Sequence, residues 1–260
     1  MYEKITELVR YKQLIRNLVA RDLKVKYRGS VIGFFWSLLN PLVMMAVYTV
    51  VFRHFLGFGD KNFPIFLMCG LLPWIFFSTS LTMATGAITG ASNLVKKVYF
   101  PREILPLSIT ISNLVQFLLT FIVLFPSILF FHIKINPLLI ILGLPVILVI
   151  HIVFTLGLSF LISSLSVYYT DTPHLLEIIT MVWFWGTPII YNFKDIPDAW
   201  KKFIMMNPMT SFINIYRDIC MFNKIPSMFE IGIVIISSII SLLMGYLVFQ
   251  KLKKRFGEEL

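Results

Sequence analysis

Long apolar segments are the feature that most constrains this chain. A helix needs about 20 mainly apolar residues to cross the hydrocarbon core of a bilayer, which is about 30 Å thick. Segments of this kind follow one another from residue 34 almost to the C-terminus, and we place six spans at residues 32–53, 63–88, 104–131, 137–164, 175–191 and 228–249. Because backbone polar groups must be satisfied inside lipid, the pattern predicts an all-α polytopic membrane protein.

The composition excludes an ordinary soluble fold. Of the 260 residues, 58% are hydrophobic and 14% are charged, against about 45–50% and about 25% in soluble domains. No polar block is long enough for a separate globular unit, so we predict one transmembrane domain over residues 1–260. Its expected parts are an interfacial helix and arm (1–30), spans one to five (32–191), an outer connection (192–227), span six (228–249) and a tail (250–260).

Basic residues predict the orientation of the chain. The net charge is +10, but Lys and Arg gather beside the apolar segments, as the positive-inside rule requires, so nucleic-acid binding is not expected. They are concentrated in the arm before residue 30, in the second connection (Lys96, Lys97 and Arg102) and in the tail. We therefore expect both termini in the cytoplasm. The charged N-terminus lacks the apolar core of a secretory signal peptide.

Two further segments are amphipathic. Residues 3–20 carry apolar side chains at three- and four-residue spacing, which predicts a basic interfacial helix. It lies either on the inner leaflet or against the protein's own cytoplasmic surface. Residues 192–227 are too apolar for a flexible loop, and Asn207-Pro208 divides them into two short helices. These either dip into the outer membrane edge or form a cap outside it.

No catalytic motif is present. The sequence lacks the phosphate loop of nucleotide-binding proteins, as well as HExxH, GxSxG and CxxC. Asp171, His174 and Glu177 share a helical face and could form a metal or proton-relay site, although Asp171 before Thr172-Pro173 also fits a plain helix start. His151 stands alone within the fourth span, where a neutral, hydrogen-bonded imidazole competes with a functional group. We therefore predict neither a catalytic nor a metal site.

Aromatic residues mark two of the spans. Trp and Tyr often anchor helices at membrane interfaces, which accounts for some of these side chains. Their flat, uncharged faces also suit the apolar C–H faces of sugars. A channel lined by such groups would let a glycan slide through it. The candidate lining residues are Phe34, Phe35, Trp36 and Tyr48 in the first span and Trp183, Phe184, Trp185 and Tyr191 in the fifth.

Three stretches carry a resemblance to a known family. They are KYRGSVIGFFWSLLNPL (26–42), NLVKKVYFPREILPL (93–107), and FWGTPIIY (184–191) with the later MMNPM (205–209). In this order they resemble the type-2 ABC exporter permeases that move O-antigen polysaccharide or wall teichoic acid on an undecaprenyl carrier. The resemblance implies a bacterial inner-membrane permease that pairs with a second copy of itself and with two cytoplasmic ATPase subunits. ATP and Mg would bind to those subunits, with no cofactor in this chain.

The resemblance also implies roles for individual residues. The segment resembling the ATPase coupling helix and its exit contains Asn93, Lys96, Lys97, Tyr99, Pro101, Arg102 and Glu103. Residues 192–222 resemble paired outer gate helices, with Trp200, Phe203, Phe212 and Tyr216 as candidate seals. The first and fifth spans resemble the pair that lines the channel, and the N-terminal helix resembles the one beside the carrier-lipid entry.

Two other functions fit parts of the sequence. An ABC exporter of a drug or small lipid would share the topology, with the aromatics forming a pocket. An intramembrane glycosyl or acyl transferase would use Asp171, His174 or Glu177. The genes next to this one would distinguish the first alternative, and activity of the purified chain alone would distinguish the second.

Overall fold

The computed structural model describes residues 10–27, 35–55, 57, 61–193 and 196–260, and the regular elements within these ranges are helices. The principal α-helices, in chain order, are α2 (Lys12–Tyr27), α3 (Trp36–Tyr48), α4 (Phe63–Thr85), α5 (Ser92–Lys97), α6 (Ile104–Phe130), α7 (Pro137–Tyr168), α8 (Thr172–Trp185), α9 (Asp198–Met206), α10 (Pro208–Arg217), α11 (Met228–Leu252) and α12 (Phe256–Glu259). Short helical pieces join them: η2 (Thr49–Phe55), η3 (Thr89–Ala91), η5 (Asp218–Phe222) and η6 (Lys253–Arg255).

The predicted all-helical membrane fold is confirmed. Among the described residues, five helical segments are long and apolar enough to cross a bilayer: Leu38–Phe55, Phe63–Thr85, Ile104–Phe130, Pro137–Tyr168 and Met228–Glu259. Apolar side chains such as Ile141, Val146 and Leu247 are exposed on the outer faces of these helices. Lipid would cover such faces in a membrane.

The predicted helix at residues 175–191 is wrong in its extent. Helix α8 has 14 residues, or about 21 Å at 1.5 Å per residue, which is short of a 30 Å hydrocarbon core. It ends at Trp185 because Gly186 follows as the C-cap and Pro188 cannot continue the helical hydrogen bonding. Pro188 therefore lies beyond the helix, whereas Pro41, Pro73, Pro126 and Pro145 lie inside helices as predicted.

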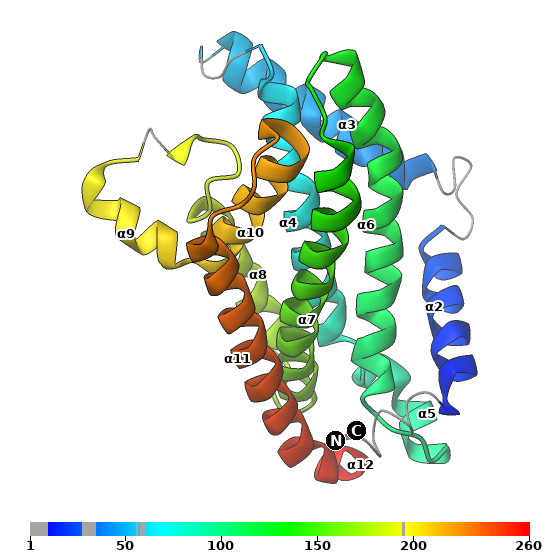
Figure 1. Ribbon diagram of the computed structural model, residues 1–260. Coiled ribbons are helices and arrows are strands. Elements are labelled where there is room, and N and C mark those ends of the chain that lie inside the picture. Colours follow the sequence, from blue (N-terminus) through cyan, green and yellow to red (C-terminus); the bar gives the residue numbers. More distant parts are fainter. Residues whose placement is uncertain (1–9, 28–34, 56, 58–60, 194–195) are drawn as a thin grey trace.

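The core of the molecule forms around α4. Most residues of α4 are buried, and it packs against α6, α7, α8 and α10. Figure 1 shows α4, α6, α7 and α11 running side by side along the bundle. The preceding helix, α3 with η2, crosses the upper part of the bundle at a large angle to them and packs on α4 and α6. The first predicted span is therefore helical and apolar, but it runs crosswise.

Helices α7 and α11 form the closest helix pair. They run in the same direction, with Ser238 Oγ donating to Ile150 O (3.1 Å) and Ser241 Oγ donating to Phe154 O (2.8 Å). Between these helices a Cβ added to Gly245 would lie 1.8 Å from Gly157 O. Small residues let membrane helices approach in this way. The sequence of small residues on α11 therefore fixes its register on α7.

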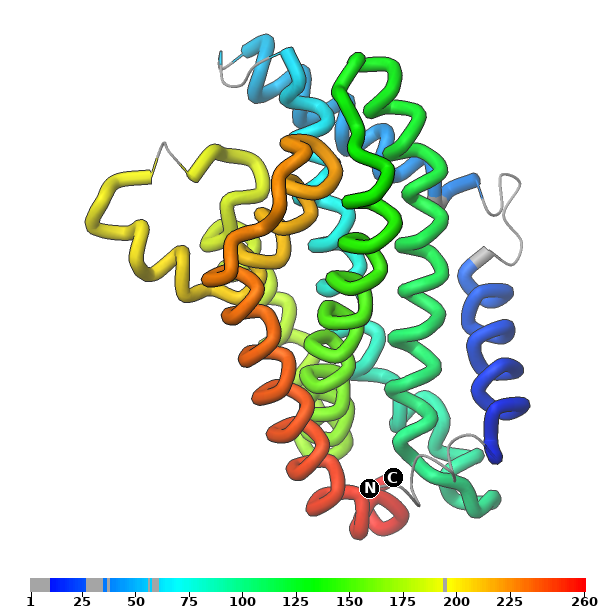
Figure 2. Tube along the Cα trace, viewed as in Figure 1, coloured from blue at the N-terminus to red at the C-terminus, as the bar shows by residue number. Residues whose placement is uncertain are grey.

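The connection from α7 to α11 carries the chain back across the molecule. Helix α7 ends at the end of the bundle where α5 lies, and α11 starts well away from that end and returns to it, where α12 and the C-terminus also lie (Figure 1). The return path runs through α8, α9 and α10. The trace in Figure 2 shows α9 projecting from the side of the bundle, and both halves of the predicted helix pair are present.

Helix α2 stands along the lower part of α6 (Figure 1). It packs on α6 through Leu18, which is buried. The helix predicted over residues 3–20 is present from Lys12 and extends beyond residue 20 to Tyr27. Residues 3–9 of the predicted helix lie outside the described residues.

Candidate functional site

Helix α5 and the residues that follow it form an exposed basic segment at one end of the bundle. Val95 and Phe100 are buried and anchor the segment to the core. The intervening side chains face outward, with Tyr99 90% exposed. The exposed members of the predicted coupling set are Asn93, Lys96, Lys97 and Tyr99. An outward-facing surface with two lysines and an aromatic ring suits contact with an acidic protein surface.

Arg102 and Glu103 lie in the same segment but point into the molecule. The buried Glu103 carboxylate accepts hydrogen bonds from Lys253 Nζ (2.7 Å) and Gln250 Nε2 (2.6 Å). Arg102 donates to the carbonyl oxygen of Lys253 and lies 5.8 Å above the ring of Phe256. These contacts join the predicted coupling segment to the end of α11 and to α12.

The electrostatics of Glu103 follow from this ion pair. Burial alone would raise the pKa of the Glu103 carboxyl, but the hydrogen bonds from Lys253, the backbone and Gln250 outweigh it and hold the pKa below its ordinary value. Glu103 is therefore ionised at neutral pH. Glu103 and Lys253 line a pocket of about 480 Å³. Its wall is formed by residues 95–103, which include Pro101, and by Lys253 and Lys254.

The aromatic side chains of α8 divide into two groups. Trp183 and Phe184 face the core, where Trp183 makes edge contacts with Phe77 (5.1 Å between ring centroids) and Phe184 with Trp74 (5.6 Å). Trp185 is exposed, and its carbonyl oxygen accepts a hydrogen bond from the Tyr191 hydroxyl (2.8 Å). Trp183 and Phe184 are thus partly buried against the core, whereas Trp185 is exposed.

Asn207 fixes the position of Trp183. Its side-chain oxygen accepts from Trp183 Nε1 (2.8 Å) and from the Met209 amide (3.0 Å), which caps α10. Its nitrogen donates to Gly186 O (3.1 Å) and Thr187 Oγ1 (2.9 Å). One side chain thus joins the end of α8 to the break between α9 and α10. In the sequence, Asn207 is recognisable only as a break between two helices.

An apolar pocket of about 540 Å³ connects two predicted sets. Trp185 and Tyr191, from the predicted channel, line it together with Trp200 and Phe203, from the predicted outer gate. Trp200 and Phe203 are both more than half exposed on α9. Residues from the first predicted span lie elsewhere: Phe35 and Trp36 are exposed near α6, Tyr48 packs on the core, and Phe34 lies outside the described residues.

Phe212 and Tyr216 lie in the core of the molecule, separate from that pocket. Both are almost fully buried, and Phe212 stacks on His151 with 4.5 Å between ring centroids. The Tyr216 hydroxyl lies 3.3 Å from His151 Nδ1, which agrees with the hydrogen-bonded interpretation of that histidine. Their positions suit packing between α7 and α10.

Arg217 is buried, and the sequence gives no sign of its partners. Its guanidinium donates to Pro188 O (2.7 Å), Ile189 O (2.7 Å) and Phe66 O (3.3 Å), and it lies 3.5 Å above the Phe66 ring. The arginine thereby satisfies carbonyl groups in the non-helical stretch after α8. Gly70 provides the space, because a Cβ there would lie 2.9 Å from the guanidinium.

The predicted alternative site at Asp171, His174 and Glu177 is exposed at the start of α8. No group of three or more potential metal ligands comes together among the described residues. Cys69 and Cys220 are buried free thiols.

Comparison with known proteins identifies the family. Residues 13–221 match the model of the ABC-2 type transporter family. The chain is 31% identical over 275 residues to the O-antigen export system permease protein RfbA of Myxococcus xanthus, covering 100% of both chains. It is 33% identical over 238 residues to the protein of that name from Klebsiella pneumoniae, covering 92% of this chain and 91% of the relative. The polysialic acid transport protein KpsM of Escherichia coli is 18% identical over 244 residues, covering 90% of this chain and 91% of the relative. With its apolar helices, this chain is a multi-pass membrane protein and belongs to the ABC-2 type transporter family.

Proposed function

We propose that this chain is the permease subunit of an ATP-driven exporter of cell-surface polysaccharide, with O-antigen as the substrate. The observation that carries the proposal is the full-length similarity, at 31–33% identity, to proteins named as O-antigen export permeases. A drug or small-lipid exporter has no comparable support.

The proposed assembly contains two copies of this chain and two cytoplasmic ATPase subunits that bind ATP and Mg. The absence of a phosphate loop in the sequence supports a separate ATP site. The exposed face around Lys96, Lys97 and Tyr99 would bind the ATPase. We also propose that the whole chain is one membrane domain with both termini in the cytoplasm. Helix α8 and the segment after it would make the fifth of six crossings.

The proposed path for the glycan uses the exposed aromatic side chains. Phe35, Trp36, Trp185 and Tyr191 would contact sugar rings, and Trp200 and Phe203 would form the exit. Helix α3 packs on α4 and α6, whereas α8 packs on α4 and α7. In a pair of permeases, the aromatic residues around α3 of one copy would face those around α8 of the other. The glycan would enter on its undecaprenyl carrier from the inner leaflet.

Deletion of the gene tests this function. The expected result is loss of one surface polysaccharide with accumulation of its lipid-linked precursor inside the cell. A strain carrying a hydrolysis-defective variant of the partner ATPase should show the same phenotype. Unchanged surface polysaccharide in the deletion strain would refute the proposal, provided that no second copy of the transporter is encoded.

A further inference from the structure

Lys26 lies beside the middle of a membrane-spanning helix. Helices α2 and α6 run in the same direction, and Lys26 Nζ donates to Gln116 Oε1. Gln116 is twelve residues beyond Ile104, the first residue of α6, which corresponds to about 18 Å along the helix. A cation at this depth is costly unless another group compensates its charge.

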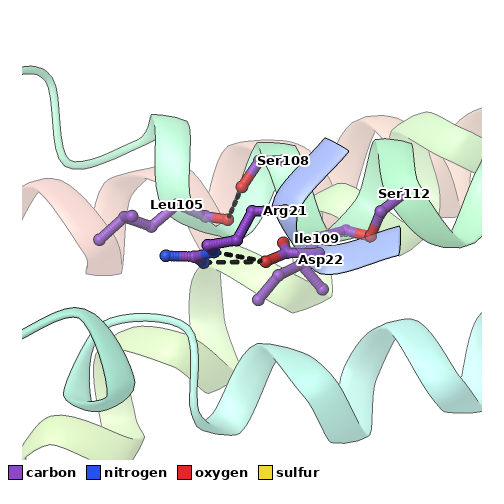
Figure 3. A network of polar contacts seen from close by, with 6 residues as sticks. All are labelled: Arg21, Asp22, Leu105, Ser108, Ile109 and Ser112. Carbon is purple, nitrogen blue, oxygen red and sulfur yellow. Dashed lines mark hydrogen bonds and ion pairs between the residues drawn. The ribbon is translucent and has the colours of Figure 1, made fainter. Parts of the chain in front are cut away.

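The carboxylate closest in sequence is already paired. Asp22, one helical turn before Lys26, binds Arg21 at 2.8 Å. Figure 3 shows Asp22 beside Ser108 and Ser112 of α6, whose hydroxyls donate to carbonyl oxygens of their own helix. No ion pair joins Lys26 to an acidic side chain in the part of the chain that the structure describes. The charge of Lys26 is therefore available to an anion.

Lys26 lines a pocket with both polar and apolar walls. The pocket has a volume of about 340 Å³ and lies between α2, α3, α4 and α6. No Asp or Glu lines it. Its polar side chains are Lys26, Asn40, Thr79, Asn113, Gln116 and Thr120, and its apolar walls come from residues such as Trp36, Phe76 and Phe117.

The polar groups of the pocket offer hydrogen-bond donors. The side-chain nitrogens of Asn40 and Gln116 have no acceptor among the described residues, and Lys26 uses one of its three N–H groups on Gln116. By contrast, Thr120 Oγ1 donates to Phe117 O (2.6 Å) and Asn113 Nδ2 donates to Ile109 O (3.1 Å). A cation with two amides presents donors in the arrangement that a phosphate oxygen accepts.

We propose that this pocket binds the phosphate group of a membrane lipid. Lys26, Gln116 and Asn40 would bind the phosphate oxygens, while Trp36, Phe117 and their apolar neighbours would contact the hydrocarbon chain. An anion without a hydrocarbon chain would leave the apolar wall uncovered, and a neutral lipid would leave Lys26 without a counter-charge. The inference does not depend on which polymer the protein exports.

Equilibrium binding of labelled dioctanoyl phosphatidic acid to the full-length chain in dodecyl maltoside micelles, whose detergent carries no phosphate, tests this site. The wild-type protein should bind the probe saturably. Because a charge-assisted contact is lost, Lys26→Gln should weaken binding at least about tenfold. Lys26→Arg should retain binding. Lys24→Gln is the matched control, since it removes the same charge from the same helix at a position that does not line the pocket, and should bind like the wild type.

Competition in the wild-type protein separates the possible ligands. Dioctanoylglycerol and inorganic phosphate should each compete much more weakly than unlabelled phosphatidic acid. Equal competition by dioctanoylglycerol would overturn the role of the phosphate, and equal competition by inorganic phosphate would overturn the role of the lipid. Unaltered binding in Lys26→Gln, or no saturable binding to the wild type, would overturn the site itself. These competition arms still decide the question if Lys26→Gln does not fold.

Discussion

At the scale of single residues, Asn207 has the most connected side chain around α8. It contacts Trp183, Gly186, Thr187 and Met209 through four hydrogen bonds. All the capacity of its amide nitrogen and oxygen is thereby used. The geometry makes Asn207 the connection between α8 and α10, and it fixes the position of the partly buried Trp183 ring.

Substitution of Asn207 by Ala should destabilise the protein by roughly 2–3 kcal/mol, because a helix cap and three further hydrogen bonds are lost. The measurement is thermal unfolding of the detergent-purified protein. Asn93→Ala removes an exposed amide and is the control, with no expected change. An Asn207→Ala variant as stable as the wild type would contradict the role described for this side chain.

Asp218 gives a pH-dependent prediction. Its burial, reinforced by Glu230, raises the pKa of the Asp218 carboxyl from 3.8 to about 6. The folded state therefore binds a proton more readily than the unfolded state, so stability falls as the pH rises from about 4 to about 6 and the penalty is complete above that range. Asp218→Asn should be more stable than the wild type at pH 7.5, with a smaller difference at pH 5.

Unfolding temperatures at these two pH values check the prediction. Asp198 is the control, because the Lys201 ammonium holds the pKa of its carboxyl below the ordinary value. Asp198→Asn should therefore gain no stability at pH 7.5. A difference between Asp218→Asn and the wild type that does not depend on pH would refute the assignment.

From the sequence, the helices that carry these residues are easier to predict than the contacts that each side chain makes. The sequence predicts a second amphipathic helix after the Asn207-Pro208 break, and α10 is present there. It does not distinguish Phe212 and Tyr216, which are buried, from Trp200 and Phe203, which are exposed. The sequence does not show that Arg217 is buried, because its carbonyl partners come from residues 66, 188 and 189, which only the tertiary fold brings together.

At the scale of elements, the pairing of α7 with α11 depends on small residues. A Cβ at Gly157 would lie 2.4 Å from the backbone nitrogen of Leu242, and one at Gly245 would meet Gly157 O. Neither contact can be relieved by a side-chain rotation. The two helices would have to separate.

Gly245→Ala should therefore destabilise the protein by about 1–3 kcal/mol, as expected for overpacking. Gly232→Ala provides a control in the same helix, since a Cβ there meets nothing within 4 Å. That variant should be neutral or slightly more stable, because Ala is the better helix former. Equal unfolding temperatures for the two variants would contradict the close packing of α7 and α11.

Helix ends were harder to predict than helices. Apolar length alone placed α4, α6, α7 and α11 within a few residues of their observed positions, but it extended the helix at α8 to residue 191. The local signal for an earlier end was present in Gly186 and Pro188. The parallel register of α7 and α11 and the crosswise course of α3 depend on tertiary packing, which hydropathy does not describe.

At the scale of the whole molecule, the coupling segment and the C-terminal end of the chain form one unit. Glu103 and Arg102 bind the segment around Lys253, while Lys96 and Lys97 remain exposed. Arg102 and Glu103 thus make contacts within the chain, whereas Lys96 and Lys97 are available to a partner. Movement of α5 by a partner would also act on α11 through the Glu103–Lys253 pair.

Replacement of both Lys96 and Lys97 by Glu should weaken association with the ATPase at least about tenfold, because like charges would then face an acidic surface. The measurement is the dissociation constant of the purified subunits, together with ATPase stimulation. Lys201→Glu with Lys202→Glu is the control, since these lysines lie on α9, away from α5. Unchanged affinity in the Lys96 and Lys97 variant would show that this surface does not bind the ATPase.

The central claim is that this chain supplies the path while a separate ATPase supplies the free energy. Translocation of lipid-linked O-antigen into proteoliposomes measures this directly. We expect the polysaccharide to become inaccessible to an added glycosidase only when the chain, its ATPase partner and ATP are all present. Translocation at the same rate without ATP, or by the ATPase subunit without this chain, would contradict the account.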